Sequence, residues 1–227
     1  MLAITGNHIR HGSWTVRPQQ CINYLTCHDG QTLSDFVEGD KKRVFLGVLM
    51  VLTAQGVPML GEGSELMYSK QGHDNSYDRP DLNQIDWNNY ELHTDLVEAV
   101  AQLVMLRKRY PHFRYHDALR IRNGKGKAWD IDWIYPTGHP HQDNVNAIGF
   151  ILKPPPAWYR WRRLHKSLVV LLNGSSVGAD FHLPKGKWTK LVDGNAIVVD
   201  MEGIRNVPPA QGDYHVHPGT GVVLAAI

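Results

Sequence analysis

The sequence lacks the features that mark several large classes of protein. It holds two cysteines in 227 residues, too few for a disulfide framework. Cys21 and Cys27 lie six residues apart on one predicted strand, roughly 20 Å at the strand rise, so they cannot bond to each other there and we expect two reduced, packed thiols. Lys and Arg number 24 against 22 Asp and Glu, a formal charge of +2, which is too small to indicate a general surface for nucleic acid or another polyanion.

Long apolar segments are also missing. The most apolar run, residues 44–60, is interrupted by glycine, threonine, glutamine and proline and falls short of the roughly 20 apolar residues that a membrane span needs. The first twelve residues show no basic start followed by a long apolar region, so no secretory signal is visible and the cytoplasm is favoured. With 42% hydrophobic and 20% charged residues, the chain is typical of a folded protein with one large or two modest domains.

The first half of the chain predicts α/β structure. A strand over 21–27, an apolar helix over 41–55 and a short strand over 56–61 give the strand–helix–strand order of parallel pairing. The polar loop that follows, residues 61–89, is long enough to be functional or disordered. Apolar residues at helical spacing predict a further helix over 91–110, which begins its core face with Leu92 and carries Arg107, Lys108 and Arg109 in its last turns, where cations favour a helix end.

The second half predicts an all-β domain. From about Leu119 the apolar period changes to two, with short runs over 129–135, 145–152, 167–173, 179–183, 188–192, 196–200 and 221–226. Turn pairs such as Asn173-Gly174 and Pro218-Gly219 separate several of these runs. We therefore expect an antiparallel β-sandwich over 115–227, preceded by the α/β domain over 1–114.

A charged pair stands where the first predicted strand ends. In a parallel βα unit the carboxyl ends of the strands face the side where active sites assemble, and His28 and Asp29 occupy that end. An aspartate there can accept hydrogen bonds from two adjacent sugar hydroxyls, and a neighbouring histidine can add a third. The alternative is a turn at Asp29-Gly30 capped by its own side chain, with His28 as a buried core histidine.

These residues carry a resemblance to a known family. The stretch 22–33 resembles the strand-seven motif of the α-amylase superfamily, glycoside hydrolase family 13, in which an Asn-Tyr strand ends in His-Asp. Residues 55–60 are similar to the family's strand eight. Further similarity covers the loop of pullulanases and related debranching enzymes (71–77 through 83–87), the segment before strand seven (4–7) and the last strand of the C-terminal sandwich (219–227).

The resemblance implies a fold and a set of site residues. The fold would be the C-terminal part of a (β/α)8 TIM barrel, about strands seven and eight with their helices, followed by the β-sandwich. Asp29 would be the aspartate that stabilises the transition state, and His28 would bind the sugar at the cleavage subsite. Asn75 and Tyr77 would shape that subsite. Glu62 and Glu65 flank the end of strand eight and could tune the pocket, but a surface or loop role fits them better.

The resemblance also implies an activity that this chain alone would not have. Retaining glycosidases need a nucleophilic carboxylate and an acid about 5 Å apart, and in this family those come from strands four and five, whereas the similarity begins just before strand seven. We expect the C-terminal portion of a larger hydrolase, or a truncated gene product, that is inactive by itself. The full-length parent would cleave α-1,6 bonds of α-glucans such as pullulan, glycogen or starch-like chains. An open barrel edge predicts self-association. The alternative function is a non-catalytic carbohydrate-binding or scaffold module.

Metal sites receive little support from the sequence. His139 with His141, and His215 with His217, could each ligate a metal, but no further ligand stands at suitable spacing, so a solvated loop or edge is favoured. A structural calcium remains open because three carboxylates lie close in sequence, although they lack EF-hand spacing: Asp74, Asp78 and Asp81. No cofactor is expected.

Two further patterns have alternative interpretations. Residues 158–166 interleave aromatic and cationic side chains, as single-stranded nucleic-acid sites do, but a hairpin with one wet face explains them equally well. Sugar stacking on Trp158 or Trp161 also stays open. Asn173-Gly174-Ser175 matches a glycosylation acceptor, although a hairpin turn is the better interpretation.

Overall fold

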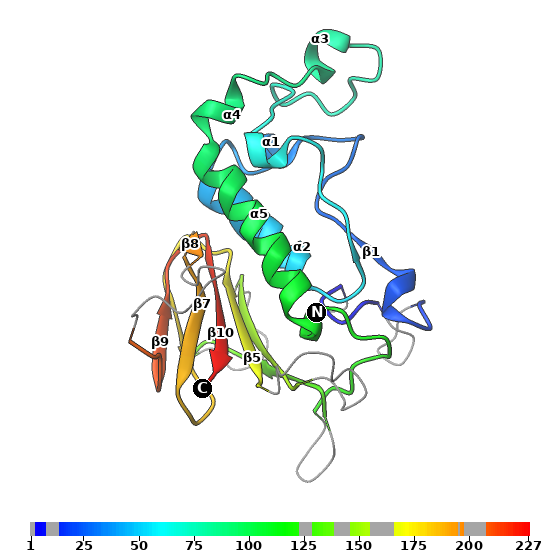
Figure 1. The fold of residues 1–227 in the computed structure, drawn as a ribbon. Helices are drawn as coiled ribbons and strands as arrows, with labels where there is room; N and C mark the ends of the chain where they lie inside the picture. Colours follow the sequence, from blue (N-terminus) through cyan, green and yellow to red (C-terminus); the bar gives the residue numbers. More distant parts are fainter. Residues whose placement is uncertain are drawn as a thin grey trace. The chain divides into compact units, whose positions relative to one another are not determined.

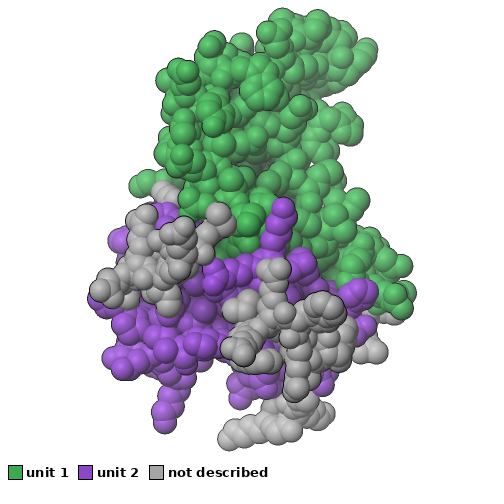
Figure 2. All heavy atoms as spheres, viewed as in Figure 1, with its two compact units in different colours: residues 1–107 green, residues 108–227 purple. Residues whose placement is uncertain are grey.

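The computed structural model of the chain describes residues 3–7, 14–122, 129–138, 146–154, 166–194, 196–197 and 208–227. The chain divides into two compact units, unit 1 up to Arg107 and unit 2 from Lys108 onward, which are coloured separately in Figure 2. The sequence places this boundary after residue 114.

Unit 1 contains a parallel strand pair joined through helices, and Figure 1 labels its first strand and these helices. Strand β1 (Ile22–Asn23) pairs with β2 (Val57–Pro58), and α1 (Leu33–Phe36) and α2 (Lys41–Thr53) lie between them in sequence. The predicted strand–helix–strand order and parallel pairing are confirmed. The predicted strand lengths are wrong, because each strand has one neighbour in the described part of the chain and β2 ends at a proline, which has no N–H to donate.

Helix α2 is fixed at its start by a side-chain cap and along its length by burial. One carboxylate oxygen of Asp40 accepts the backbone N–H groups of Lys42 at 2.9 Å and Arg43 at 3.3 Å, which satisfies two donors that a helix start leaves without partners. Nine of its 13 residues are buried, in keeping with the apolar sequence. The helix ends where Ala54 turns extended, two residues before the predicted end.

Helix α5 (Thr94–Arg109) is bonded to α2 at both ends, so the two helices run in the same direction. At their starts, Lys41 Nζ lies 3.0 Å from a carboxylate oxygen of Asp95. At their ends, the guanidinium of Arg107 donates to the carbonyls of Leu52 at 2.6 Å, Ala54 at 2.7 Å and Gly56 at 2.7 Å. The first pair is exposed and contributes little, whereas the Arg107 side chain is buried and holds the corner between α2 and β2.

The predicted helix over 91–110 is two helices in the structure. A short α4 (Asn89–Leu92) ends at His93, whose φ of −127° breaks the helical path before α5 begins. As a result Leu92, predicted on the core face, is 69% exposed, while Leu96, Val100 and Leu103 are buried as predicted. Unit 1 also contains the short helical turns η2 (Pro18–Gln20), η3 (Ser64–Leu66) and α3 (Pro80–Asn83), and unit 2 begins with η4 (Pro111–Phe113).

Unit 2 is built from antiparallel strands. The six-stranded sheet has the order β3-β4-β5-β10-β7-β8, and β6 pairs with β9 in a separate two-stranded sheet. The bounds are β3 Ile131–Ile134, β4 Ala147–Leu152, β5 Leu168–Asn173, β6 Ala179–His182, β7 Trp188–Gly194, β8 Ala196–Ile197, β9 Asp213–Val216 and β10 Thr220–Ala226. Each strand predicted from the period of two is present, with shifted ends. Strand β9 was not predicted.

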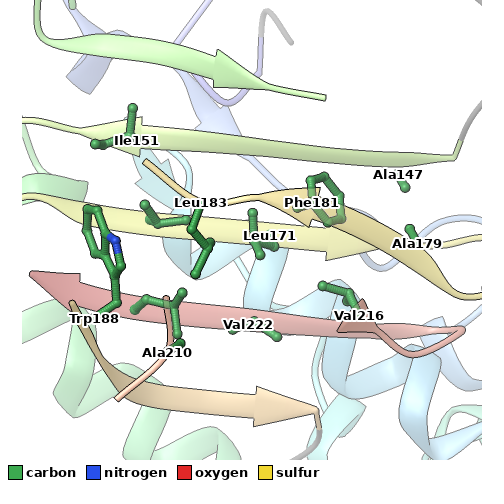
Figure 3. Close-up of a cluster of buried hydrophobic side chains, with 12 residues drawn as sticks. Ala147, Ile151, Leu171, Ala179, Phe181, Leu183, Trp188, Ala210, Val216 and Val222 are labelled. Carbon is green, nitrogen blue, oxygen red and sulfur yellow. The ribbon is translucent and has the colours of Figure 1, made fainter. Parts of the chain in front are cut away.

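A hydrophobic cluster joins the two sheets of unit 2 (Figure 3). Phe181 of β6 and Val216 of β9 belong to the same cluster as Leu171 of β5 and Val222 of β10. The other face of the two-stranded sheet is polar: its cross-strand partners Asp180 and His215 lie 2.7 Å apart, and His182 and Asp213 lie 2.8 Å apart. One face of this small sheet is therefore committed to the core and the other to water.

Asn173 is a buried structural residue. Its amide nitrogen donates to the carbonyls of Val177 at 2.8 Å and Val216 at 3.0 Å, and its oxygen accepts from the backbone N–H of Ser175 at 3.0 Å. These contacts confirm a turn in preference to a glycosylation acceptor. The turn is not a hairpin, however, because it connects β5 of the large sheet to β6 of the small one.

Both cysteines are free thiols, as predicted. Cys21 is buried, but Cys27 is only partly buried, so the expectation of two packed thiols is wrong for Cys27. In the part of the chain that the structure describes, no helix is both long enough and apolar enough to cross a membrane.

Replacement of Arg107 by methionine should destabilise unit 1. Three carbonyls at the corner between α2 and β2 lose a charged donor, and we expect the free energy of unfolding to fall by about 3 kcal/mol. Urea unfolding followed by circular dichroism at 222 nm measures this change, because the described α-helices all lie within residues 33–109. Arg109→Met, at an exposed position of the same helix, should cost less than about 0.5 kcal/mol. Equal losses in the two variants would contradict the role of Arg107.

Candidate functional site

A cavity of about 590 Å³ opens at the carboxyl ends of β1 and β2 in unit 1. Because the two strands are parallel, the segments that leave them emerge on the same side. The lining comes from two stretches that the strands bring together, residues 22–33 and residues 59–85. The polar and aromatic members of the lining are Tyr24, Thr26, Cys27, His28, Asp29, Thr32, Glu62, Ser64, Tyr68, Lys70, Asp74, Ser76, Tyr77 and Asn83.

His28 and Asp29 lie on the wall of this cavity and face solvent. His28 Nε2 is 3.3 Å from Asp29 Oδ2, and the two side chains are 87% and 86% exposed. His28 is therefore not a buried core histidine. An exposed carboxylate beside an imidazole offers acceptors and a donor to a ligand without first giving up buried partners.

The two residues predicted from the following loop are placed differently. Tyr77 lines the cavity and is 85% exposed. Asn75 does not belong to the lining, although its neighbours Asp74 and Ser76 do; its backbone N–H donates to the Asp74 carboxylate at 2.7 Å. The structure thus brings His28, Asp29 and Tyr77 around one cavity, whereas Asn75 is exposed and lies outside the lining.

Several lining residues were not predicted from the sequence. Glu62, for which the sequence favours a surface or loop role over a pocket role, lines the cavity, whereas Glu65 does not. Lys70, Tyr68 and Asn83 come from the polar loop, where no periodic pattern marks inward-facing positions. Tyr24 could have been predicted as a lining residue, because it directly follows Asn23 at the end of β1. It lines the cavity and is half exposed.

Acidic groups dominate the charge around the cavity. Burial, followed by the negative charges of Asp35 and Glu62, raises the pKa of Tyr68, so its hydroxyl keeps its proton at neutral pH. That hydroxyl donates to the carbonyl of Leu82 at 2.6 Å, which fixes the ring between the two ends of the loop. Carboxylates, amide groups and exposed tyrosine faces together suit a polyhydroxylated ligand, which needs acceptors for hydroxyls and apolar area for stacking.

The metal sites considered from the sequence gain no support from the geometry. In the described ranges no three His, Cys, Asp or Glu side chains converge as a metal site. Of the three carboxylates weighed for calcium, Asp81 is engaged by Arg79 at 2.6 Å. His215 and His217 lie on the outer side of β9, with ring centroids 5.1 Å apart. His139, His141, Trp158 and Trp161 lie outside the described residues.

Known proteins resemble this chain in sequence. The pullulanase of Bacillus subtilis strain 168 is 37% identical over 115 residues, which covers 46% of this chain and 16% of that protein. The glycogen debranching enzyme of Pectobacterium atrosepticum is 27% identical over 218 residues, which covers 75% of this chain and 30% of that enzyme. The chain thus spans less than a third of the length of either relative. No family model matches it.

Solved structures resemble it over nearly its whole length. Pullulanase from Bacillus acidopullulyticus matches with a TM-score of 0.77 at 23% identity, over 99% of this chain and 26% of that one, a likeness that shows the fold alone. Apo pullulanase from Paenibacillus barengoltzii matches with a TM-score of 0.73 at 26% identity, over 99% of this chain and 33% of that one. The homologues of this chain are therefore pullulanases and glycogen debranching enzymes of glycoside hydrolase family 13, and the partial coverage fits a match to their C-terminal portion.

Proposed function

We propose that unit 1 carries one wall of an α-glucan site of the pullulanase or debranching type. The observation that carries this proposal is the exposed His28-Asp29 pair on the cavity at the carboxyl ends of two parallel strands. Asp29 is the transition-state-stabilising aspartate, His28 binds the sugar at the cleavage subsite, and Asn75 and Tyr77 shape that subsite. Tyr77 belongs to the lining, and Asn75 acts from an exposed position between the lining residues Asp74 and Ser76.

The chemistry of Asp29 suits this role. Its two carboxylate oxygens can accept hydrogen bonds from two adjacent ring hydroxyls, and His28 lies close enough to bind a third. Glycoside cleavage passes through an oxocarbenium-like state. An anion positioned beside the ring interacts more strongly with that developing positive charge than with the neutral ground state, and this difference lowers the barrier.

The proposed fold is the C-terminal part of a (β/α)8 barrel followed by an antiparallel β-sandwich. Strands β1 and β2 correspond to strands seven and eight, and α2 with α5 correspond to the helices that follow them. The parallel pairing, the shared direction of the two helices and the likeness to pullulanase structures support this assignment. In unit 2, the hydrophobic cluster between the six-stranded and two-stranded sheets supports a sandwich.

We further propose that the chain alone does not hydrolyse glucans. A retaining mechanism needs a nucleophile and an acid about 5 to 5.5 Å apart. The carboxylates of the described lining are Asp29, Glu62 and Asp74; the resemblance gives Asp29 the stabilising role and assigns neither catalytic role to the other two. In the full-length parent, the same site would serve cleavage of α-1,6 bonds in pullulan, glycogen or starch-like chains by the retaining mechanism.

Glucan binding without hydrolysis is the expected result for the purified chain. Maltotetraose should slow the alkylation of Cys27 by iodoacetamide, because Cys27 lines the cavity, while buried Cys21 stays unreactive. Pullulan, glycogen and maltooligosaccharides should yield no new reducing ends. Asp29→Ala should weaken binding of maltotetraose about tenfold, or roughly 1.4 kcal/mol. Sustained turnover that is lost in Asp29→Ala would overturn the proposed inactivity.

Two substitutions compared in the same binding assay distinguish this function from that of a non-catalytic binding module. If the second half of the chain holds the glucan through exposed aromatic residues, Trp158→Ala should abolish binding and Asp29→Ala should leave it unchanged. The opposite pattern supports the cavity in unit 1. Absence of any glucan binding by the intact chain would contradict both functions.

Self-association through the strand pair is the expected consequence of a partial barrel. Ile22 and Val57 are paired across β1 and β2, and their side chains are 56% and 43% exposed. Among the described residues, neither strand has a second neighbouring strand. Apolar side chains and backbone hydrogen-bonding groups are therefore accessible to a second copy of the chain. Light scattering should show mass rising with concentration, and Val57→Lys should shift the chain to monomer. Val177→Lys, at an exposed valine in unit 2, is the matched control. A monodisperse monomer at all concentrations counts against the partial-barrel assignment.

A further inference from the structure

The carboxylate of Asp35 joins two loops that are far apart in the sequence. One of its oxygens accepts from the hydroxyl of Ser69, and the other accepts from the backbone N–H of Lys70 at 2.8 Å. The start of α1 does not need this carboxylate, because Thr32 Oγ1 already accepts the backbone N–H of Asp35 at 3.1 Å. Besides a hydrogen bond with the Thr32 side chain at the start of its own helix, the Asp35 carboxylate is thus bonded to the loop after β2.

Lys70 makes the reciprocal contact. Its side chain is almost fully enclosed, with the residue 4% exposed, and Nζ donates to the carbonyl of His28 at 3.4 Å. Gln31 Nε2 also reaches the carbonyl of Gly72 at 3.4 Å. The carboxylate of Asp35 in α1 therefore holds the backbone at Lys70, and the ammonium of Lys70 holds the backbone at His28, in the segment that leads into α1. We call the set Asp35, Ser69, Lys70 and the His28 carbonyl the Asp35 junction.

The charge on Asp35 is stable at neutral pH. Partial burial raises the pKa of Asp35, but hydrogen bonds from the Ser69 side chain, the Lys70 backbone, the Thr32 side chain and the Gly72 backbone together outweigh it and hold the pKa below its usual 3.8. A carboxyl with a lowered folded-state pKa contributes stability above its unfolded pKa and loses it as the pH falls through the folded value. The junction is therefore intact throughout the neutral range.

The far end of the same loop segment is fixed as well. Ser76 Oγ donates to the side-chain oxygen of Asn83 at 2.7 Å, and the backbone N–H of Arg79 donates to the carbonyl of Ser76 at 2.9 Å. With Lys70 held at one end and Ser76 at the other, the short stretch between them has little freedom. Asp74 lies between these two anchors and Tyr77 directly follows the second, and both line the cavity.

We propose that Asp35 is a positioning residue whose carboxylate sets the distance between the His28-Asp29 wall and the Asp74–Tyr77 wall of the cavity. Asp35 itself does not line the cavity, whereas residues on both sides of the junction do, so it acts through the backbones it holds. The ligand named below rests on the proposed glucan function. The positioning role itself does not, because the width of the cavity is measured without a ligand.

Amide hydrogen exchange of the unliganded chain tests the junction directly. Asp35→Asn keeps the size of the side chain and an acceptor for Ser69, but it removes the charge and one oxygen acceptor. We expect the amides of residues 69–76 to exchange about tenfold faster, as their opening free energy falls by roughly 1.4 kcal/mol, while the amides of α2 keep their rates. Asp95→Asn, at an exposed carboxylate paired with Lys41, is the matched control and should change neither region.

The rate of Cys27 alkylation measures how accessible this wall of the cavity is to a reagent. A purely structural role of Asp35 would leave that rate unchanged. Cys27 lies beside His28 on the wall that the junction holds, so Asp35→Asn should raise the rate severalfold while Cys21 stays protected. Unchanged rates at Cys27 and at residues 69–76 would overturn the proposal. If Asp35→Asn does not fold, Ser69→Ala can be used instead, because it removes one hydrogen bond of the Asp35 junction. The exchange and alkylation rates should then change in the same direction but by a smaller factor.

Binding of maltotetraose completes the test. If the chain binds maltotetraose, Asp35→Asn should weaken it about tenfold, and unchanged affinity despite faster exchange would overturn the positioning role. If the chain does not bind maltotetraose at all, the proposed glucan function fails. The exchange and alkylation rates then still decide whether Asp35 sets the cavity.

Discussion

Four carbonyl oxygens at the corner between α2 and β2 are held by two side chains, and the rest of unit 1 depends on this arrangement. Helix ends leave their last carbonyls without partners, and a buried carbonyl without a donor is costly. Arg107 supplies donors to Leu52, Ala54 and Gly56, and the amide of Asn23 supplies one to Gln55. A planar guanidinium can serve three acceptors at once, which a lysine ammonium on the same stem does with less geometric control.

This corner determines where the candidate site lies. The Gly56 carbonyl immediately precedes β2, and Asn23 is the last residue of β1, so the two side chains fix the register in which Ile22 pairs with Val57. The register in turn places the ends of both strands at one level, where His28-Asp29 and the loop from Met59 begin the cavity wall. The Asp35 junction then spaces the two loops. Backbone groups held by polar or charged side chains recur at each step, and each contact joins segments distant in sequence.

The sequence predicts what local pattern determines and misses what distant partners determine. Helix α2 follows from its apolar run and the order of β1 and β2 from strand and turn signals. Arg107 was interpreted as a last-turn cation because its partners lie more than 50 residues earlier, and the break at His93 has no proline or glycine to mark it. Strand β9 was missed because only Val216 of its four residues is buried. The His28-Asp29 pair was found from its place at a strand end, whereas Lys70 and Asp74 come from a loop without periodicity.

Solvent exposure limits what Asp29 can do in this chain alone. At 86% exposure, hydrogen bonds from Asp29 to the proposed sugar ligand would compete with water, and two unit charges 4 Å apart gain only about 1 kcal/mol in bulk water against about 4 kcal/mol at an effective dielectric constant of 20. Under the proposed function, stabilisation of a developing positive charge would therefore require that further walls exclude water from the cavity. The wall that unit 1 supplies would then bind and orient the glucan. The energy that would make Asp29 a strong catalytic group would have to come from surfaces that close over it.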